Sequence, residues 1–374
     1  MKSNYRTIED LVFRVDERNF NSEANVLLGV SIDKCFIPSV ANTIGTDLTK
    51  YKLIRKNDFA VSLMQVSRDS RIPIARQTGY EVAMMSPAYP IFRVKNPEEI
   101  LPEYLEMWFK RDEFDREAAF IAVGGVRGSM PWNEFAQMRV YVPEIEQQRK
   151  IVGAYRIVED RIKLKRKIND NLEATAQSYF DSLFFPSVEP DCTLADIAEV
   201  NPVRQLKKGD EARCFDMSTL PTNGCIPAGD EIKPYNGGVR FINGDTLIAR
   251  ITPCLENGKA AYINLLQDGE VAFGSTEYIV FAPKDKMPSS FYYFLIRNNQ
   301  FVTFALQFMN GSSGRQRVSG EELATFPLSR PSFENLIAFD KVGSMVLEQM
   351  KEIADEIHML KQLQEIITAT LSIH

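Results

Sequence analysis

Hydrophobic residues recur every three or four positions over two long stretches of the chain, residues 144–186 and 332–374. Apolar residues there step by alternating fours and threes, which is the seam of a heptad repeat. The same register occurs in both stretches, because Val158 lies 188 residues before Val346. Each stretch therefore predicts a long helix, of roughly 60 Å for about 40 residues at 1.5 Å per residue.

These helices are expected to pair with each other. A rod of roughly 60 Å is longer than an ordinary domain is wide, so its seam is most easily buried against a second rod. Their alternation with the intervening segments makes the pairing antiparallel. Lys165 and Asn169 interrupt the first seam and could fix the alignment. The alternative, two amphipathic helices each lying on its own domain, remains open. The residues predicted to pair the helices are Ile151, Val158, Ile162, Leu172, Val346, Met350, Ile353, Ile357, Leu360 and Ile367.

The other two segments, residues 1–143 and 187–331, have mixed character. Short β-rich runs alternate in them with turns, and each segment holds one helix-like aromatic stretch, at 102–120 and 288–308. The aromatic residues are expected in the core rather than on a base-stacking surface. An α+β fold follows, with two mixed domains joined by two long helices.

The two mixed segments are copies of one plan. Thr7–Leu11 recurs as Thr193–Ile197, and Asn57–Val61 recurs as Gly244–Ile248. Two similar units on one chain predict a pseudo-twofold object, whose partner is often nearly twofold itself. Duplex DNA is the commonest partner of that kind.

Composition narrows the possible classes of protein. The 374 residues suit two or more domains, and a composition of 44% hydrophobic and 25% charged residues is typical of a soluble globular protein. No apolar run approaches the roughly 18 residues that span a bilayer, so a cytoplasmic location is expected. The five widely spaced cysteines form no CxxC pair, and both histidines, His358 and His374, lie near the end of the chain. Disulfides, a zinc site and histidine acid–base catalysis are therefore not expected.

The net charge of −6 argues against a protein that simply coats DNA. Local charge differs, because acidic residues are concentrated in 332–374, whereas basic residues outnumber acidic ones between Lys50 and Arg76. A groove-facing edge and a solvated face are about equally good interpretations of that basic segment. Its candidate DNA contacts, with counterparts in the second copy, are Arg55, Lys56, Arg68, Arg71, Arg76, Arg250 and Lys259.

A glycine-rich stretch follows the aromatic stretch in each copy, at Gly124–Ser129 and Gly311–Val318. Glycines allow close backbone approach, serine hydroxyls suit phosphate oxygens, arginine can read guanine and glutamine can pair with adenine. One such stretch alone would be interpreted as a tight surface loop, but its recurrence favours a function. The candidate residues are Arg127, Ser129, Ser312, Ser313, Arg315, Gln316 and Arg317.

Motifs of catalysis are missing from the sequence. It has no Walker-type loop, no dinucleotide fingerprint, no HExxH and no nucleophile elbow. Residues 201–204 begin like an amino-methyltransferase loop but lack its second proline and its aromatic residue. Asp191, Glu231 and Lys233 have a nuclease-like spacing that is common by chance. No catalytic residue and no metal site are predicted for this chain.

Taken in order, these motifs resemble the specificity subunit of Type I restriction–modification systems. The likeness is carried in the second copy by Gly244–Arg250, Phe273–Val280, Tyr292–Leu295, Gly311–Ser319 and Phe326–Leu328. In the first copy it is carried by Ser86–Pro90, Leu101–Leu105 and Gly124–Ser129.

The resemblance implies that residues 1–143 and 187–331 are target recognition domains, each reading one half of a split DNA sequence. Residues 144–186 and 332–374 would form the spacer, an antiparallel coiled coil that docks two methyltransferase subunits. Nuclease/translocase subunits could join them, and S-adenosylmethionine, Mg²⁺ and ATP would belong to these partners, with no cofactor on this chain. Because the glycine-rich stretches differ, an asymmetric target is expected. The alternative is a scaffold or decoy that binds the methyltransferase without reading DNA.

Overall fold

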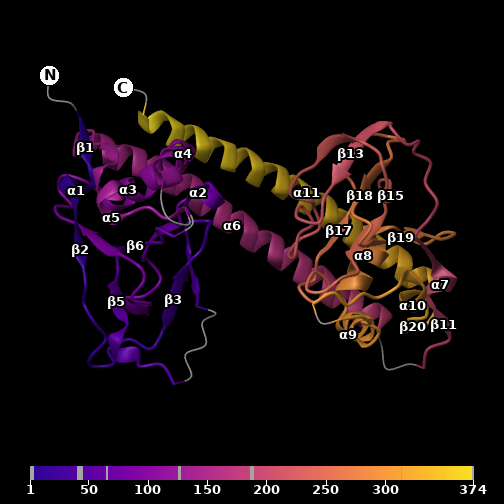
Figure 1. Ribbon diagram of the computed structural model, residues 1–374. Coiled ribbons are helices and arrows are strands. Elements are labelled where there is room, and N and C mark those ends of the chain that lie inside the picture. Colours follow the sequence, from indigo (N-terminus) through magenta and orange to yellow (C-terminus); the bar gives the residue numbers. More distant parts are fainter. Residues whose placement is uncertain are drawn as a thin grey trace. The chain divides into compact units, whose positions relative to one another are not determined.

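The computed structural model divides into two compact units (Figure 1). Unit 1 comprises Met1–Asp160 with Leu360–His374, and unit 2 comprises Arg161–Met359. The residues that the structure describes are 4–39, 45–64, 66–124, 128–185, 189–312 and 314–372.

Within its described residues, unit 1 contains two four-stranded sheets, ordered β2-β9-β6-β7 and β4-β3-β8-β5. Neighbouring strands in them are antiparallel except β3 and β8, which are parallel. A short pair, β1 and β10, joins the start of the domain to its end. The strands are β1 Tyr5–Thr7, β2 Val12–Val15, β3 Leu27–Val30, β4 Phe36–Pro38, β5 Lys52–Arg55, β6 Phe59–Val61, β7 Ile74–Arg76, β8 Val82–Met85, β9 Ile91–Val94 and β10 Arg139–Tyr141.

Short helices cover the sheet that contains β6 and bury an aromatic core against it. Phe59, Phe92 and Phe109 lie at the centre of that core, with ring centroids 5.2 to 6.1 Å apart. The helices are α1 Ile8–Leu11, η1 Leu48–Lys50, α2 Val66–Asp69, α3 Pro102–Phe109, α4 Asp112–Ile121, η2 Ala122–Gly124 and α5 Trp132–Gln137.

Unit 2 repeats this plan strand by strand. Its sheets are ordered β12-β19-β16-β17 and β14-β13-β18-β15, and β13 and β18 form the parallel pair. The strands are β11 Cys192–Thr193, β12 Ala198–Val200, β13 Glu211–Phe215, β14 Glu231–Pro234, β15 Val239–Phe241, β16 Thr246–Ala249, β17 Ala260–Tyr262, β18 Ala272–Gly274, β19 Tyr278–Pro283 and β20 Pro327–Leu328. The helices are α7 Leu194–Ile197, α8 Ser290–Arg297, α9 Asn299–Gln307 and α10 Gly320–Ala324. The sequence repeat is therefore a repeat of topology.

Even the entry to each unit has the same local chemistry. Thr7 and Asp10 form a capping box at the start of α1, and Thr193 and Asp196 form the same box at the start of α7. In the first box the Thr7 hydroxyl and the Asp10 carboxylate each accept from the other residue's amide, and in the second the Asp196 carboxylate accepts from the amide and the hydroxyl of Thr193. The recurring Thr-x-x-Asp motif thus begins the short helix that precedes β2 in unit 1 and β12 in unit 2.

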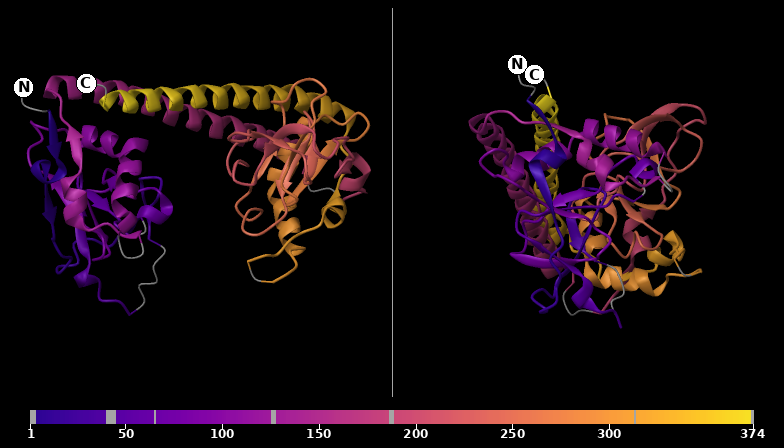
Figure 2. Two further views of the ribbon diagram at one scale, coloured as in Figure 1. Left: turned by 45° about the horizontal axis from the view of Figure 1, so that its top comes forward. Right: turned by 60° about the vertical axis from the view of Figure 1, so that its left-hand side comes forward.

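Two long helices follow the mixed domains, α6 Ile145–Phe184 and α11 Phe333–Ala369, the latter ending in η4 Thr370–Ser372. Every position of the heptad seam on both helices is buried or half-buried. In unit 2, the rings of Phe180 and Phe339 are 5.0 Å apart, and Arg161 contacts Glu356. The partner number falls as the α6 number rises, so the helices are antiparallel there. Figure 2 shows them side by side in unit 2.

In unit 1 the same two helices share the domain core. Val152 of α6 and Leu371 beyond α11 are both buried in the aromatic cluster, and Ile151, Tyr155 and Ile367 pack against it. The long helices therefore are part of the two compact units rather than separate bodies.

Two unusual residues of the seam have clear roles. Lys165 points its ammonium at Glu356, with an Nζ–Oε2 distance of 2.5 Å. A side chain at Gly343 would begin 2.7 Å from the ring of Phe339, so only glycine leaves room for that ring. At Lys165 an ion pair therefore takes the place of an apolar seam contact. At Gly343 the missing side chain makes room for the ring of Phe339.

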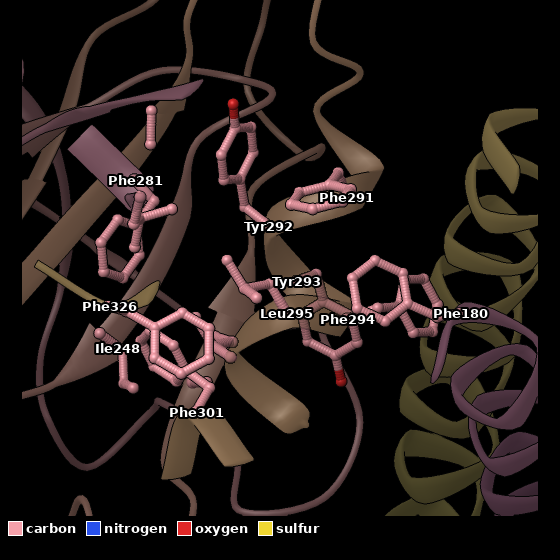
Figure 3. Packing of buried hydrophobic residues seen from close by; sticks show 14 of the residues in the cluster. Phe180, Ile248, Phe281, Phe291, Tyr292, Tyr293, Phe294, Leu295, Phe301 and Phe326 are labelled. Carbon is pink, nitrogen blue, oxygen red and sulfur yellow. The ribbon is translucent and has the colours of Figure 1, made fainter. Parts of the chain in front are cut away.

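The core of unit 2 is built from the aromatic stretch of α8 (Figure 3). Tyr292, Tyr293 and Phe294 are completely buried, and Phe294 faces Phe180 of α6 with 6.1 Å between ring centroids. The prediction that these aromatic stretches form the core is confirmed for these residues. No helix among the described residues is both long and apolar enough to cross a bilayer.

Candidate nucleic-acid interface

The second glycine-rich stretch forms a tight hairpin loop in unit 2. The amides of Asn310 and Arg317 each donate to the other residue's carbonyl, at 3.0 and 2.9 Å. Gly311 and Gly314 have φ values of +130° and +77°, which L residues with side chains rarely adopt. The turn leaves the Arg315 side chain exposed, without an ion pair or hydrogen bond to other described residues.

This loop is hydrogen-bonded to the residues that directly follow strand β16. The amide of Val318 donates to the carbonyl of Arg250 at 3.0 Å, and the amide of Gln316 donates to the Thr252 hydroxyl at 3.1 Å. Gln316 itself is half-buried beside this contact. The strand end and the loop therefore present their side chains as one surface.

An ion pair secures the base of the loop. The Nε of Arg317 lies 3.0 and 2.9 Å from the two carboxylate oxygens of Glu277, and its Nη2 lies 2.7 Å from one of them. These hydrogen bonds hold the pKa of Glu277 below its ordinary value. Arg317 thus fixes the loop, while Arg250, whose Nε is buried without a partner in the described chain, points a half-buried guanidinium beside it.

The first glycine-rich stretch is attached in the same way in unit 1. The amide of Met130 donates to the carbonyl of Leu63, which follows β6, at 2.9 Å. Gly128 has a φ of +74°, and a side chain there would begin 2.4 Å from the Ser67 hydroxyl. Ser129 is half-buried next to it. Arg127 and Ser313, two of the predicted contacts, lie outside the described residues.

Most basic residues of the segment 50–76 are paired with carboxylates. Arg55 binds Glu17 and Glu23, Lys56 binds Glu81, and Arg68 binds Asp69. The segment therefore presents less positive charge than its sequence suggests.

Arg76 is the most enclosed of the predicted DNA contacts in this segment. Its side chain is 11% exposed and donates to Glu106 and Asn57, at 2.8 and 2.6 Å. Arg71, by contrast, is exposed and makes no ion pair with other described residues. In unit 2, Lys259 donates to the carbonyl of Met217 at 2.6 Å. Among the candidates that the structure describes, Arg71 and Arg315 are therefore the cations most available to a phosphate or a base.

The nuclease-like spacing does not assemble as a site. Asp191 accepts from the amide of Arg330, whereas Lys233 binds Glu231 and Asp216, at 2.8 and 3.0 Å. Across the described ranges, no group of three or more His, Cys, Asp or Glu side chains is placed to hold a metal ion.

Some contacts of this surface could not be found from the sequence. Glu277 lies 40 residues before Arg317, and nothing in their spacing marks them as partners. The buried carboxylates Asp58 and Asp245 could have been found, since they occupy the same place in the two copies of the Asn57–Val61 motif.

Comparison with known proteins agrees with the predicted resemblance. The chain is 31% identical over 192 residues to the EcoAI specificity subunit of a Type I restriction enzyme from Escherichia coli, covering 48% of this chain and 32% of that protein. It is 30% identical over 145 residues to the EcoEI specificity subunit from Escherichia coli, covering 37% and 24%. The chain thus spans about a third or less of the length of these curated relatives. No protein-family model matches it.

A solved structure extends the likeness to the whole fold. The crystal structure of a Type I restriction–modification S subunit from M. genitalium matches with a TM-score of 0.55 at 12% identity, covering 98% of this chain and 95% of that chain. The resemblance and the α+β fold class predicted from the sequence are both confirmed.

Proposed function

On the premise that this chain is a relative of the specificity subunits of Type I restriction enzymes, we propose that it reads a bipartite, asymmetric DNA sequence. Each unit recognises one half-site through its glycine-rich loop and the adjoining strand end. The chain carries no catalytic group of its own and acts in the cytoplasm, where the DNA is.

One observation carries this proposal. The two loops are attached to equivalent strand ends by equivalent hydrogen bonds, Met130 to Leu63 at 2.9 Å and Val318 to Arg250 at 3.0 Å. The frame is the same, but the side chains on it differ, with Gly128 and Ser129 in one loop and Gln316 and Arg317 at the equivalent positions of the other. A shared frame that presents different donors and acceptors suits two different base sequences.

The partners follow from the same proposal. Two methyltransferase subunits dock on the long helices, whose outer faces keep exposed apolar residues such as Ile157 and Met359. S-adenosylmethionine, Mg²⁺ and ATP bind to the methyltransferase and to nuclease/translocase subunits, not to this chain.

Modified-base sequencing tests the function. The chain is co-expressed with its methyltransferase partner in a host that lacks other DNA methylation. We expect methylation within a motif of two unlike half-sites separated by a fixed unspecific spacer. Methylation of one short continuous motif, or none, would contradict the proposal.

Much of the basic charge is neutralised within the chain, as a scaffold or decoy that does not read DNA would allow. That interpretation is tested separately. The assembled complex is mixed with duplexes that contain or lack the methylated motif. A decoy binds the methyltransferase but gives no preference between these duplexes, whereas a reading subunit prefers the motif.

A further inference from the structure

Phe120, Val123 and Met64 are among the large apolar side chains of unit 1 that are exposed to solvent. Phe120 is 80% exposed, Val123 is 74% exposed and Met64 is 62% exposed. Leaving a phenylalanine in water loses the stabilisation that its burial would give. A group of neighbouring exposed apolar side chains therefore indicates a surface that binds a partner.

These side chains lie on elements adjacent to the described ends of the first glycine-rich stretch. Phe120 is near the end of α4, Val123 is in η2, and Met64 directly follows Leu63, the residue whose carbonyl binds the loop. Helix α2 packs against both α4 and η2, and Gly128 lies against α2 through Ser67. The exposed apolar residues thus belong to the elements that carry the loop.

The fold does not require them. The buried pair Phe114 and Ala118 of α4 corresponds to the buried pair Phe301 and Ala305 of α9, 187 residues later. The same offset places Gln307 and Asn310 at the positions of Phe120 and Val123. Both counterparts are exposed and polar. Exposed apolar residues at these two positions are therefore peculiar to unit 1, where they lie in the elements that lead into its loop.

One cation near these residues is available to a polyanion. Arg71 is exposed after α2 and makes no ion pair with other described residues, whereas Arg116, one turn before Phe120 on α4, is 72% exposed but paired with Glu113 at 3.2 Å. The nearby carboxylates Asp69 and Asp115 are neutralised by Arg68 and Lys34, at 2.9 and 2.8 Å. Exposed apolar side chains near an available arginine match DNA, whose bases offer apolar methyl groups and π-faces between rows of phosphates.

We propose that Phe120, with Val123 and Met64, makes an apolar contact with the bases of the half-site read by unit 1. Phe120 packs on the 5-methyl group of a thymine, as aromatic and methyl-bearing side chains do in specific complexes. The inference rests on the proposed function and adds a specificity-determining contact that is not a hydrogen bond.

The test replaces Phe120 and Val123 by the residues of unit 2, in the double variant Phe120→Gln/Val123→Asn. Because both positions are exposed and both replacements occur at the equivalent places of α9 and its following turn, the variant should fold. Phe20→Gln, a phenylalanine of unit 1 that is 71% exposed in a different loop, is the matched control. Each full chain is assembled with its methyltransferase partner and titrated with duplexes carrying the methylated motif.

We expect the double variant to bind about tenfold more weakly, and Phe20→Gln to bind as the wild type does. The slope of log affinity against log salt should stay unchanged, because no phosphate contact is lost, whereas Arg71→Gln should reduce it by about 1. Deoxyuridine, which lacks the 5-methyl group, is substituted for each thymidine of the half-site in turn. The substitution should weaken binding of the wild type at one position and leave binding of the double variant unchanged.

The outcomes separate this inference from the function on which it rests. If the wild type shows no bipartite preference, the proposed function fails. If the wild type reads both half-sites and the double variant reads them equally well, only the apolar contact is overturned. Weaker assembly with the methyltransferase, at unchanged preference for the motif, would overturn it as well and assign these residues to a protein contact. Equal weakening by Phe20→Gln would also count against it.

Discussion

The carboxylate of Asp58 accepts two hydrogen bonds from the guanidinium of Arg93, with Nε–Oδ1 and Nη2–Oδ2 distances of 2.5 and 3.0 Å. Asp58 is completely buried and also accepts from the amide of Arg55 at 2.9 Å. Unit 2 buries Asp245 at the equivalent place. There the carboxylate is paired with Arg204, which follows β12, and the Nη2–Oδ1 distance is 2.8 Å. The equivalent buried carboxylates of the two units are thus paired with arginines from different elements, β9 in unit 1 and the segment after β12 in unit 2.

Removing this carboxylate should destabilise unit 1. Asp58→Ala removes the two hydrogen bonds that Arg93 makes with the buried carboxylate and leaves the guanidinium its 3.7 Å contact with Glu17. This should cost about 3 kcal/mol, the lower end of the range for breaking a buried ion pair, because Arg93 is partly exposed. Urea unfolding of the full chain measures the change in the free energy of unfolding. Asp33→Ala, at an exposed position of the same unit, is the control. A shift no larger than that of the control would mean that the pair does not stabilise the unit.

Recognition by unit 2 should depend on Arg315. Its side chain is exposed at the tip of the hairpin, and Arg315→Ala should cost about 1–3 kcal/mol of binding if it reads a base. The loss should relax one position of one half-site, which modified-base sequencing detects. Lys286→Ala, an exposed cation in another loop of unit 2, should leave the motif unchanged. Equal weakening on every sequence would show that Arg315 contacts only phosphate.

The attachment of α6 to unit 2 should depend on Phe180. Its ring is fully buried, and its centroid lies 4.9 to 6.1 Å from the ring centroids of Phe184, Phe291, Phe294 and Phe339. Phe180→Ala should cost about 3–5 kcal/mol, because a cavity replaces these contacts. Chemical denaturation measures it.

Ser178→Ala, exposed on the same helix, is the control for that substitution. If both variants unfold at the same urea concentration, the aromatic cluster does not hold the helix.

The fold was largely predictable because it depends on periodicity and repetition. The heptad seam marks which side of α6 and α11 is buried, and buried aromatic residues such as Tyr292 lie in the stretches predicted for the core. Both signals are local or repeat along the chain, so one sequence is enough to read them.

The site was less predictable, because exposure and pairing are properties of the folded chain. Arg76 stands in a basic segment, yet its guanidinium is held by Glu106, 30 residues away. Phe120 stands in an aromatic stretch whose Phe114 is buried, yet it is itself 80% exposed. Residue type alone therefore separated neither paired from free cations nor core from surface aromatics.

Helix pairing in unit 2 should weaken in acid because of Glu356. Hydrogen bonds from Lys165 and Arg161 hold its pKa below the ordinary value of 4.5. An acid whose pKa is lower in the folded state stabilises the fold above its unfolded-state pKa and loses that effect as the pH falls through the folded-state pKa. The contribution should therefore be complete at neutral pH and disappear below about pH 4.5.

Urea unfolding between pH 7 and pH 3 checks this for the wild type and Glu356→Gln. The variant should be less stable than the wild type at pH 7, and this difference should vanish at the acid end, where the wild-type carboxylate is protonated. Glu352→Gln, at an exposed glutamate one turn away on α11, should follow the wild type throughout. A difference between the wild type and Glu356→Gln that stayed constant from pH 7 to pH 3 would mean that the side chain acts by packing. The ion pair with Lys165 would then not set the alignment of the two helices.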